Sequence, residues 1–294
     1  MRKALIATVL IGTLGGGVFF SGCGSNPMSS AVSSVTESAD SKSASLAPYI
    51  KAVSWFNNWS FTFNYATAPD LADMRAGKHP SNLNLPSYDR LQEELKEATG
   101  GGSSSFDSVD SSTKEVLDIL EKLVPLSEKM QAYYSSAQYK VDGYAEWDKY
   151  VQEYLPLYDK FDAAYGKLDQ ATSQASYQIS EEKIQAAKAA GHENEATFRE
   201  MYLVASEIVE TFDRGDNATV QSNLQKLQTL NNNFNPKTDN DNSGDVKSFK
   251  ESMNSFIGNV RTYLSGDRKD SEDIIRTYNR MIDEMNDVNP NTLD

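Results

Sequence analysis

Apolar, mostly aromatic side chains recur at alternating spacings of three and four residues between Tyr144 and Ile179. The positions in this series are Tyr144, Trp147, Val151, Tyr154, Tyr158, Phe161, Tyr165, Leu168, Thr172, Ala175 and Ile179. Only an α-helix places such positions on one face of the chain. If the helix continues to about residue 190, it is about 70 Å long at about 1.5 Å per residue. A helix of that length requires partner helices along its whole length.

Similar spacings predict further helices on both sides of this one. We expect them near residues 46–66, 87–95, 110–137, 193–212, 217–234, 246–263 and 274–288, with Pro125 bending or restarting the third. Turns rich in glycine, proline and polar residues separate these segments, and no alternating strand pattern of any length competes with them. Because short connections favour antiparallel neighbours, the sequence predicts an all-α fold, an elongated antiparallel bundle of about six to eight helices.

The charge of the chain restricts its partners. The 294 residues include 28 basic and 42 acidic side chains, which give a formal net charge of −14. A nucleic-acid backbone would repel such a surface, so we expect no nucleic-acid partner. The same sign disfavours electrostatic binding to anionic lipid, so any membrane attachment would be hydrophobic or covalent. Beyond residue 22, no stretch of the sequence is apolar enough to cross a bilayer.

The first 22 residues have the organisation of a secretory signal peptide. Two basic residues precede an apolar run that ends at Phe20, and two small residues, Ser21 and Gly22, follow it. The order Phe20, Ser21, Gly22, Cys23 resembles a bacterial lipobox, although Phe20 stands where leucine is usual. This resemblance implies cleavage between Gly22 and Cys23 and attachment of diacylglycerol to the Cys23 thiol.

Cys23 is the only cysteine of the chain, and it stands where the lipid would be attached. Acyl chains on this residue would contribute about 0.8 kcal/mol per buried methylene, enough to hold the protein firmly to a bilayer. Gly24 is not aspartate, so by resemblance to other lipoproteins the inner-membrane retention signal is missing. We therefore expect an outer-membrane protein that faces the periplasm. The alternative is an ordinary leader after which Cys23 carries no lipid.

Residues 23–45 are predicted to form a flexible, lipid-anchored tether. Their composition is dominated by Ser, Ala, Thr and Val and shows no sustained period. Such a stretch buries too little apolar surface to offset the loss of backbone entropy on ordering. The expected organisation is therefore a signal peptide at 1–22, a tether at 23–45 and a helical domain at 46–294.

Nine aromatic residues near the middle of the chain form the first candidate for a binding site. They are Tyr133, Tyr134, Tyr139, Tyr144, Trp147, Tyr150, Tyr154, Tyr158 and Tyr165. Tyrosine offers an apolar ring and one hydroxyl group, which suits sugars and peptides. Most of the nine lie on helical stripes, where aromatic residues usually form a core. We therefore expect core packing, with a binding groove between two diverging helices as the alternative.

Two short segments contain possible metal ligands. Asp239–Gly244 has the order of oxygen ligands and glycine that opens an EF-hand loop, but Lys250 stands where a bidentate glutamate is required. His192 and Glu195 are three residues apart, but His79 is the only other histidine and a zinc site needs three or four ligands. We expect a solvated loop and a turn, respectively, and no metal. Calcium or metal binding is the alternative.

The sequence contains no catalytic signature. It has no Gly-x-Ser-x-Gly elbow and no glycine-rich phosphate loop, and two histidines leave little choice of base. Asp and Glu pairs are too abundant on an acidic helical surface to identify a hydrolytic pair. We therefore expect no enzyme activity, no catalytic residues and no cofactor. The alternative is an envelope-glycan hydrolase that uses Asp and Glu.

Several short motifs follow the lipobox and the tether in order. They are Tyr49-Ile50-Lys51, Tyr133-Tyr134, Tyr139-Lys140, Asp142, Tyr278-Asn279, Met281-Ile282-Asp283 and Asn286. Together they resemble the YiiG-like family of bacterial lipoproteins, a domain of unknown function, over most of residues 46–290. The resemblance implies an exported, lipid-anchored, mostly helical protein, and it carries over no catalytic residues. We expect a helical module that binds or spaces a periplasmic protein or glycan.

Overall fold

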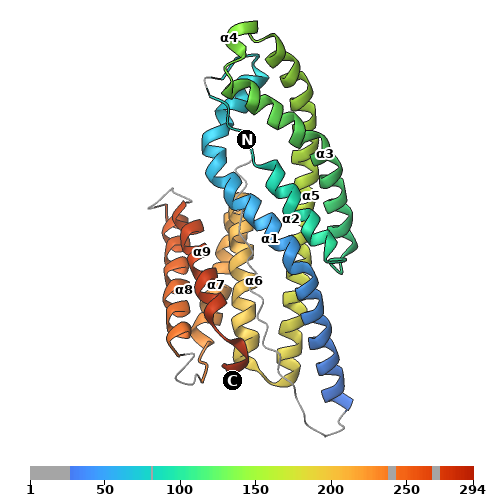
Figure 1. The fold of residues 1–294 in the computed structure, drawn as a ribbon. Coiled ribbons are helices and arrows are strands. Elements are labelled where there is room, and N and C mark those ends of the chain that lie inside the picture. The colour runs from blue at the N-terminus through green and yellow to red at the C-terminus, as the bar shows by residue number, and fades with distance from the viewer. Residues whose placement is uncertain (1–26, 81, 238–242, 267–271) are drawn as a thin grey trace. The chain divides into compact units, whose positions relative to one another are not determined.

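The computed structural model describes residues 27–80, 82–237, 243–266 and 272–294. Every regular element in these ranges is a helix, so the predicted all-α class is confirmed (Figure 1). The chain divides into two units by its internal contacts. Residues up to 44 together with 176–294 belong to unit 1, and residues 45–175 form unit 2. Helices α1 (Pro27–Arg75) and α5 (Ala145–Ala190) each contribute a segment to both units.

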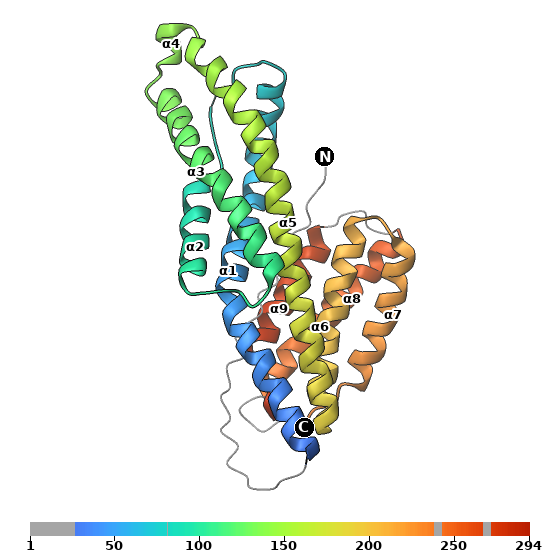
Figure 2. The ribbon, with the colours of Figure 1, turned by 90° about the vertical axis from the view of Figure 1, so that its right-hand side faces the viewer.

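Four helices of unit 1 surround one apolar core (Figures 1 and 2). They are α6 (Glu193–Asp213), α7 (Asn217–Asn233), α8 (Ser243–Leu264) and α9 (Glu272–Asp287). Helix α6 contacts α7 and α9, and α8 contacts the same two, so the four helices close a ring. Their buried faces follow the spacings of three and four found in the sequence. The rings of Phe198 and Phe249, for example, meet edge to face at 4.9 Å in this core.

The ends of these helices follow the expected local chemistry. Gly191 directly follows α5 and has a φ of 81°, and Gly215 follows α6 after one residue and has a φ of 72°. Glycine adopts this left-handed backbone conformation at little cost. The side chain of Asp216 caps α7 by accepting a hydrogen bond from the backbone N–H of Thr219 at 3.2 Å. The predicted boundaries between α5 and α6 and between α6 and α7 are therefore confirmed, whereas α8 and α9 begin at Ser243 and Glu272, a few residues before the predicted starts.

Unit 2 contains the remaining helices and has its own core. Its elements are residues 45–75 of α1, α2 (Tyr88–Gly100), α3 (Asp107–Ser135), α4 (Tyr139–Asp142) and residues 145–175 of α5. The rings of Phe56, Tyr88 and Phe161 meet there, with centroid separations between 5.1 and 6.4 Å. Because these rings come from α1, α2 and α5, the three helices share one core.

The stripe that begins at Tyr144 forms α5, as predicted. Its fully buried members are Trp147, Tyr154, Phe161, Leu168, Thr172, Ala175 and Ile179. Pro156 lies inside α5 on an exposed position, away from this stripe. Pro125 likewise lies inside α3. The sequence predicts a bend or a restart at this proline, and because α3 continues as one helix from Asp107 to Ser135, the restart is not observed.

The structure differs from the predicted flexible tether over residues 23–45. Helix α1 begins at Pro27, and residues 27–45 are therefore helical. Ala39 and Ser43 are buried, and with Leu46, Ile50 and Val53 they continue the spacing of four and three. The helical stripe thus extends into the segment assigned to the tether. The sequence pattern did not predict this part of the stripe because Ala39 and Ser43 are small or polar rather than large and apolar.

Other helix boundaries differ from the predicted ones because of local interactions. Helix α3 begins at Asp107, earlier than predicted, because the carboxylate of Asp110 closes the preceding loop. It accepts hydrogen bonds from the Ser103 hydroxyl at 2.6 Å and the Ser104 N–H at 2.9 Å. The sequence pattern does not predict α4 or the short 3-10 helix η1 (Pro290–Thr292). None of the helices in the described ranges has the length and apolar character that a membrane span requires.

Candidate functional site

The turn between α3 and α5 in unit 2 brings together several of the aromatic residues identified in the sequence. The one-turn helix α4 lies in this turn (Figure 1). The ring of His79, from the segment between α1 and α2, joins them there. We call the surface formed by His79, Tyr134, Tyr139, Val141 and Tyr144 the aromatic turn.

The rings of the aromatic turn are stacked on one another. The His79 ring lies 3.7 Å from that of Tyr144, with an angle of 10° between the planes. Tyr139 is stacked against both Tyr144 and Tyr134, at 5.1 Å in each case. The buried ring of Trp147 meets Tyr134 edge to face at 4.6 Å. The stack therefore runs from the core of unit 2 to its surface, where the His79 side chain is 35% exposed.

Hydrogen bonds hold the segment before α2 to this stack. The hydroxyl of Tyr134 donates to the backbone carbonyl of Pro80 at 3.0 Å. The Nε2 atom of His79 lies 3.3 Å from Oδ1 of Asp148 on α5. The position of His79 is thus set by the Tyr144 ring, which stacks on its face, and by the Asp148 carboxylate at its edge.

Asp142 organises the start of α5. Its carboxylate accepts a hydrogen bond from the Tyr133 hydroxyl at 2.6 Å and from the N–H of Tyr144 at 3.1 Å. Because the Tyr133 hydroxyl and the backbone amides stabilise the charged form, the pKa of Asp142 is lowered. Burial, together with the hydrogen bond to this carboxylate, raises the pKa of Tyr133. Tyr133 therefore remains a hydrogen-bond donor at neutral pH.

The backbone on both sides of α4 is strained. The described non-glycine residues with positive φ are Ser105, Ala137 and Tyr144, and the last two flank α4 with φ of 55° and 70°. Such a conformation costs a non-glycine residue about 1–2 kcal/mol. Between them lies Val141, a large apolar residue that is 81% exposed. Strain and an exposed apolar side chain often accompany binding surfaces, so the aromatic turn is our candidate functional site.

The prediction of core packing for the nine aromatic residues is confirmed for part of the set. Tyr133, Trp147 and Tyr154 are buried, whereas Tyr139 and Tyr144 are only partly buried. Tyr154, Tyr158 and Tyr165 lie farther along α5 and pack in the core with Phe161 and its neighbours. The nine residues therefore do not form one continuous groove. Sequence reasoning missed the contribution of His79, because it is distant in sequence from the residues it contacts.

A buried polar network joins α1 to α5 in unit 2. The hydroxyl of Tyr165 donates to Oδ1 of Asn57 at 2.6 Å, and the Asn57 amide donates to Asp169 at 2.8 Å. Burial raises the pKa of Asp169, and the hydrogen bond from Asn57 partly offsets this effect. The network contains one carboxylate, so it does not supply the pair that a glycosidase uses.

A shallow cavity of about 340 Å³ lies between α3 and α5 in unit 2. Its lining residues are Ser108, Ser111, Ser112, Glu115, Lys167, Gln170, Ala171 and Gln174. The Lys167 ammonium group lies 2.8 and 2.9 Å from the two carboxylate oxygens of Glu115. Because its one carboxylate is paired in this way, the cavity does not resemble a hydrolytic site with two carboxyl groups.

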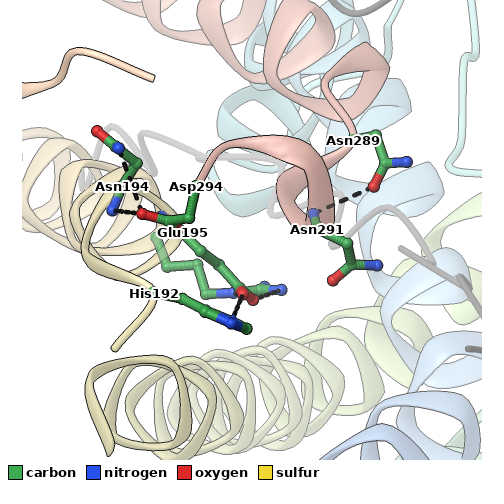
Figure 3. Close-up of polar contacts among 7 residues, drawn as sticks. His192, Asn194, Glu195, Asn289, Asn291 and Asp294 are labelled. Carbon is green, nitrogen blue, oxygen red and sulfur yellow. Dashed lines mark hydrogen bonds and ion pairs between the residues drawn. The ribbon is translucent and has the colours of Figure 1, made fainter. Parts of the chain in front are cut away.

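His192 and Glu195 lie at the start of α6 in unit 1, as predicted for a turn followed by a helix (Figure 3). The Nδ1 atom of His192 is 3.5 Å from Oε2 of Glu195, and Arg199 donates to the other carboxylate oxygen at 2.9 Å. The side chain of Asp294 accepts hydrogen bonds from the backbone N–H groups of Asn194 and Glu195 at 2.8 and 3.0 Å. A carboxylate thus occupies the positive end of α6, which fastens the segment after α9 to this helix.

Some of the predicted sites lie outside the described residues. These are the cleavage and lipid-attachment residues Gly22 and Cys23, and positions 239–242 of the possible calcium loop. Helix α8 begins at Ser243, the next residue of that loop. Within the described ranges, no group of three or more His, Cys, Asp or Glu side chains is arranged to hold a metal ion.

The two units define an all-α protein whose candidate site is a turn of stacked aromatic residues. The family described as "Protein of unknown function (DUF3829)" matches residues 45–267, and the chain belongs to this family. The match covers all of unit 2 and much of unit 1. Comparison with curated proteins and with solved structures found no match.

The strain at α4 can be tested by Ala137→Gly. We expect this substitution to raise the free energy of unfolding by about 0.5–1 kcal/mol, because glycine adopts a positive φ without the steric cost. The measurement is urea unfolding followed by tryptophan fluorescence, which reports on unit 2 because all three tryptophans lie within it. As a control, Ala163→Gly at an exposed position inside α5 in unit 2 should lower the free energy of unfolding by about 1 kcal/mol. If Ala137→Gly lowered the free energy of unfolding instead, the inferred backbone strain at this residue would be wrong.

The hydrogen bond between Tyr133 and Asp142 can be tested by Tyr133→Phe. Because the hydroxyl donor is lost, the pKa of Asp142 should rise toward its ordinary value of about 3.9. Because the pKa of Asp142 is lower in the folded state than in the unfolded state, its carboxylate stabilises the folded turn at any pH above the unfolded-state pKa. This stabilisation is lost as the pH falls through the folded-state pKa. Carboxyl-carbon NMR of Asp142 during an acid titration measures the shift. Tyr150→Phe is the control and should leave this pKa unchanged; equal effects of both variants would refute the assignment.

Proposed function

We propose that this protein is a lipoprotein of the bacterial envelope, anchored to the outer membrane through Cys23, that holds a periplasmic partner without catalysing a reaction. The observation that carries the anchor is the lipobox Phe20–Cys23 directly after an apolar leader. A diacylated and N-acylated Cys23 would bind the bilayer much more firmly than a single acyl chain can.

The resemblance to YiiG-like lipoproteins supports the same assignment. Its motifs at residues 49–51 and 133–142 lie within the range matched by the family of unknown function. The second of these motifs supplies Tyr134 and Tyr139 of the aromatic turn. One of the motifs that carry the resemblance therefore also contributes residues to the candidate site.

The geometry of the aromatic turn favours a protein partner over a glycan. Sugar rings usually bind to an open aromatic face, but Tyr139 and Tyr144 are each stacked against two neighbouring rings. What the turn offers instead is ring edges, hydroxyl groups and the exposed side chain of Val141. Tyrosine and apolar anchors of this kind are common at the centres of protein interfaces.

The start of α1 limits the distance between the proposed anchor and the fold. Residue 23 and Pro27, the first residue of α1, are four positions apart, which spans at most about 14 Å of extended chain. The predicted tether of 23 residues would have reached much farther. We therefore propose that the first helix of the protein begins close to the membrane surface.

The anchor is tested by replacing Cys23 with serine. Cells that express the wild type should incorporate an alkyne analogue of palmitate into the protein, whereas Cys23→Ser should incorporate none and appear as a soluble or unprocessed chain. Gly24→Asp serves as the matched control, because it should keep the lipid but move the protein to the inner membrane. A wild-type protein that takes up no fatty acid would refute the anchor.

The partner is tested by placing a photo-crosslinking amino acid at Val141 in intact cells. We expect a discrete protein adduct that disappears when Tyr139→Ala removes part of the stacked surface. The control position is Lys247, which is exposed on α8 of unit 1 and should give no such adduct. A product that lysozyme digestion removes would identify a glycan instead. Equal adducts at both positions would contradict a specific surface at the aromatic turn.

A further inference from the structure

The first part of α1 in unit 1 lies beside the end of α5 (Figures 1 and 2). Two ion pairs join the helices there. The ammonium group of Lys42 lies 2.7 and 3.0 Å from the carboxylate oxygens of Glu182. The ammonium group of Lys183 lies 2.8 Å from the carboxylate of Asp40. Each helix thus contributes one cation and one anion to the contact.

The apolar part of this contact is small. The buried residues that α1 contributes between positions 38 and 44 are Ala39 and Ser43. An alanine and a serine remove little apolar surface from water, in contrast to the phenylalanines at the centre of the same unit. The contact therefore depends on charge more than the rest of unit 1 does.

The ion pairs are partly open to solvent. The side chains of Lys42 and Glu182 are 29% and 25% exposed. In the second pair, the Asp40 side chain is 56% exposed and that of Lys183 is 10% exposed, so solvent reaches this pair mainly from the Asp40 side. Salt screens partly exposed pairs of this kind, and each contributes little to stability. Residues 38–44 contribute these ion pairs and two small buried residues to the contact, and such a contact opens more readily than one that rests on large apolar side chains.

We propose that residues 38–44 form an electrostatic strap, a helical segment that docks on α5 and releases reversibly. The serine- and alanine-rich composition that predicted a flexible tether describes the released state of this segment. The docked state is the helix seen in the structure. The ionic strength around the protein shifts the balance between them.

Release would change the reach of the protein, and this consequence rests on the proposed lipid anchor. As a helix, residues 38–44 span about 10 Å at about 1.5 Å per residue. As an extended chain, the same residues span up to about 23 Å at about 3.3 Å per residue. The strap would therefore act as an adjustable spacer between the bilayer and the helical units.

Hydrogen exchange of the full chain tests the strap. The protein carries Cys23→Ser, so that it can be measured without detergent, and exchange is followed by mass spectrometry on peptides that cover residues 38–44. We expect exchange there to accelerate when sodium chloride is raised to about 1 M, because salt screens both pairs. Lys42→Glu should accelerate it about tenfold, because an attraction becomes a repulsion.

A variant in which the charges of residues 42 and 182 are swapped provides the decisive comparison with Lys42→Glu. Lys42→Glu combined with Glu182→Lys restores an opposite pair and should return exchange to the wild-type rate. Lys226→Glu breaks the pair that Lys226 forms with Glu200 at 2.9 Å elsewhere in unit 1, and it should leave residues 38–44 unchanged. The strap is refuted if neither salt nor Lys42→Glu changes the hydrogen-exchange rate of residues 38–44. It is also refuted if the double variant Lys42→Glu with Glu182→Lys does not restore the wild-type rate. Because lipid is absent from this assay, failure of the anchor and failure of the strap are distinguishable.

Discussion

The structure depends on the requirement that long helices cover a continuous apolar stripe. Helix α5 presents buried side chains from Trp147 to Ile179 at every third or fourth position, and no single compact core can cover such a length. Helix α1 meets part of this requirement with its own series, from Ala39 through Ile50 and Val53. Asn57 continues that series as a buried polar residue, bonded to Tyr165 and Asp169. A polar group in an apolar seam favours one register of two helices, because any other register leaves it without partners.

The periodic, large and apolar segments could be predicted from the sequence. Helices α5 to α9 follow directly from spacing, and their ends follow from glycine and Asp216. The prediction failed where burial involves small residues. Ala39 and Ser43 occupy the seam of α1, but their side chains do not differ in hydropathy from those of a solvated linker. Only the presence of α5 beside them, with its oppositely charged side chains, shows why this stretch is ordered as a helix.

The candidate site could be predicted only in part. The tyrosines near α4 are evident in the sequence, but the stacking of His79 on Tyr144 joins residues that lie far apart along the chain. The same holds for Asp294, which accepts a hydrogen bond from the N–H of Asn194, 100 residues earlier, at the start of α6. The positive φ of Ala137 and Tyr144 has no sequence signal either, since neither residue favours that conformation. Such contacts arise from the tertiary arrangement and not from local preference. Those of His79 and of the residues around α4 form the aromatic turn of unit 2.

The stacked rings of the aromatic turn have an optical consequence. Tyrosine side chains that are held rigidly in an asymmetric arrangement produce near-ultraviolet circular dichroism, and this signal vanishes when their packing is lost even if the helices persist. Tyr134, Tyr139 and Tyr144 are held in this way, against one another and against His79. These three rings would therefore contribute to the near-ultraviolet signal together with other rigid tyrosines such as the buried Tyr154 and Tyr278, and this signal is separate from the far-ultraviolet signal of the helical backbone.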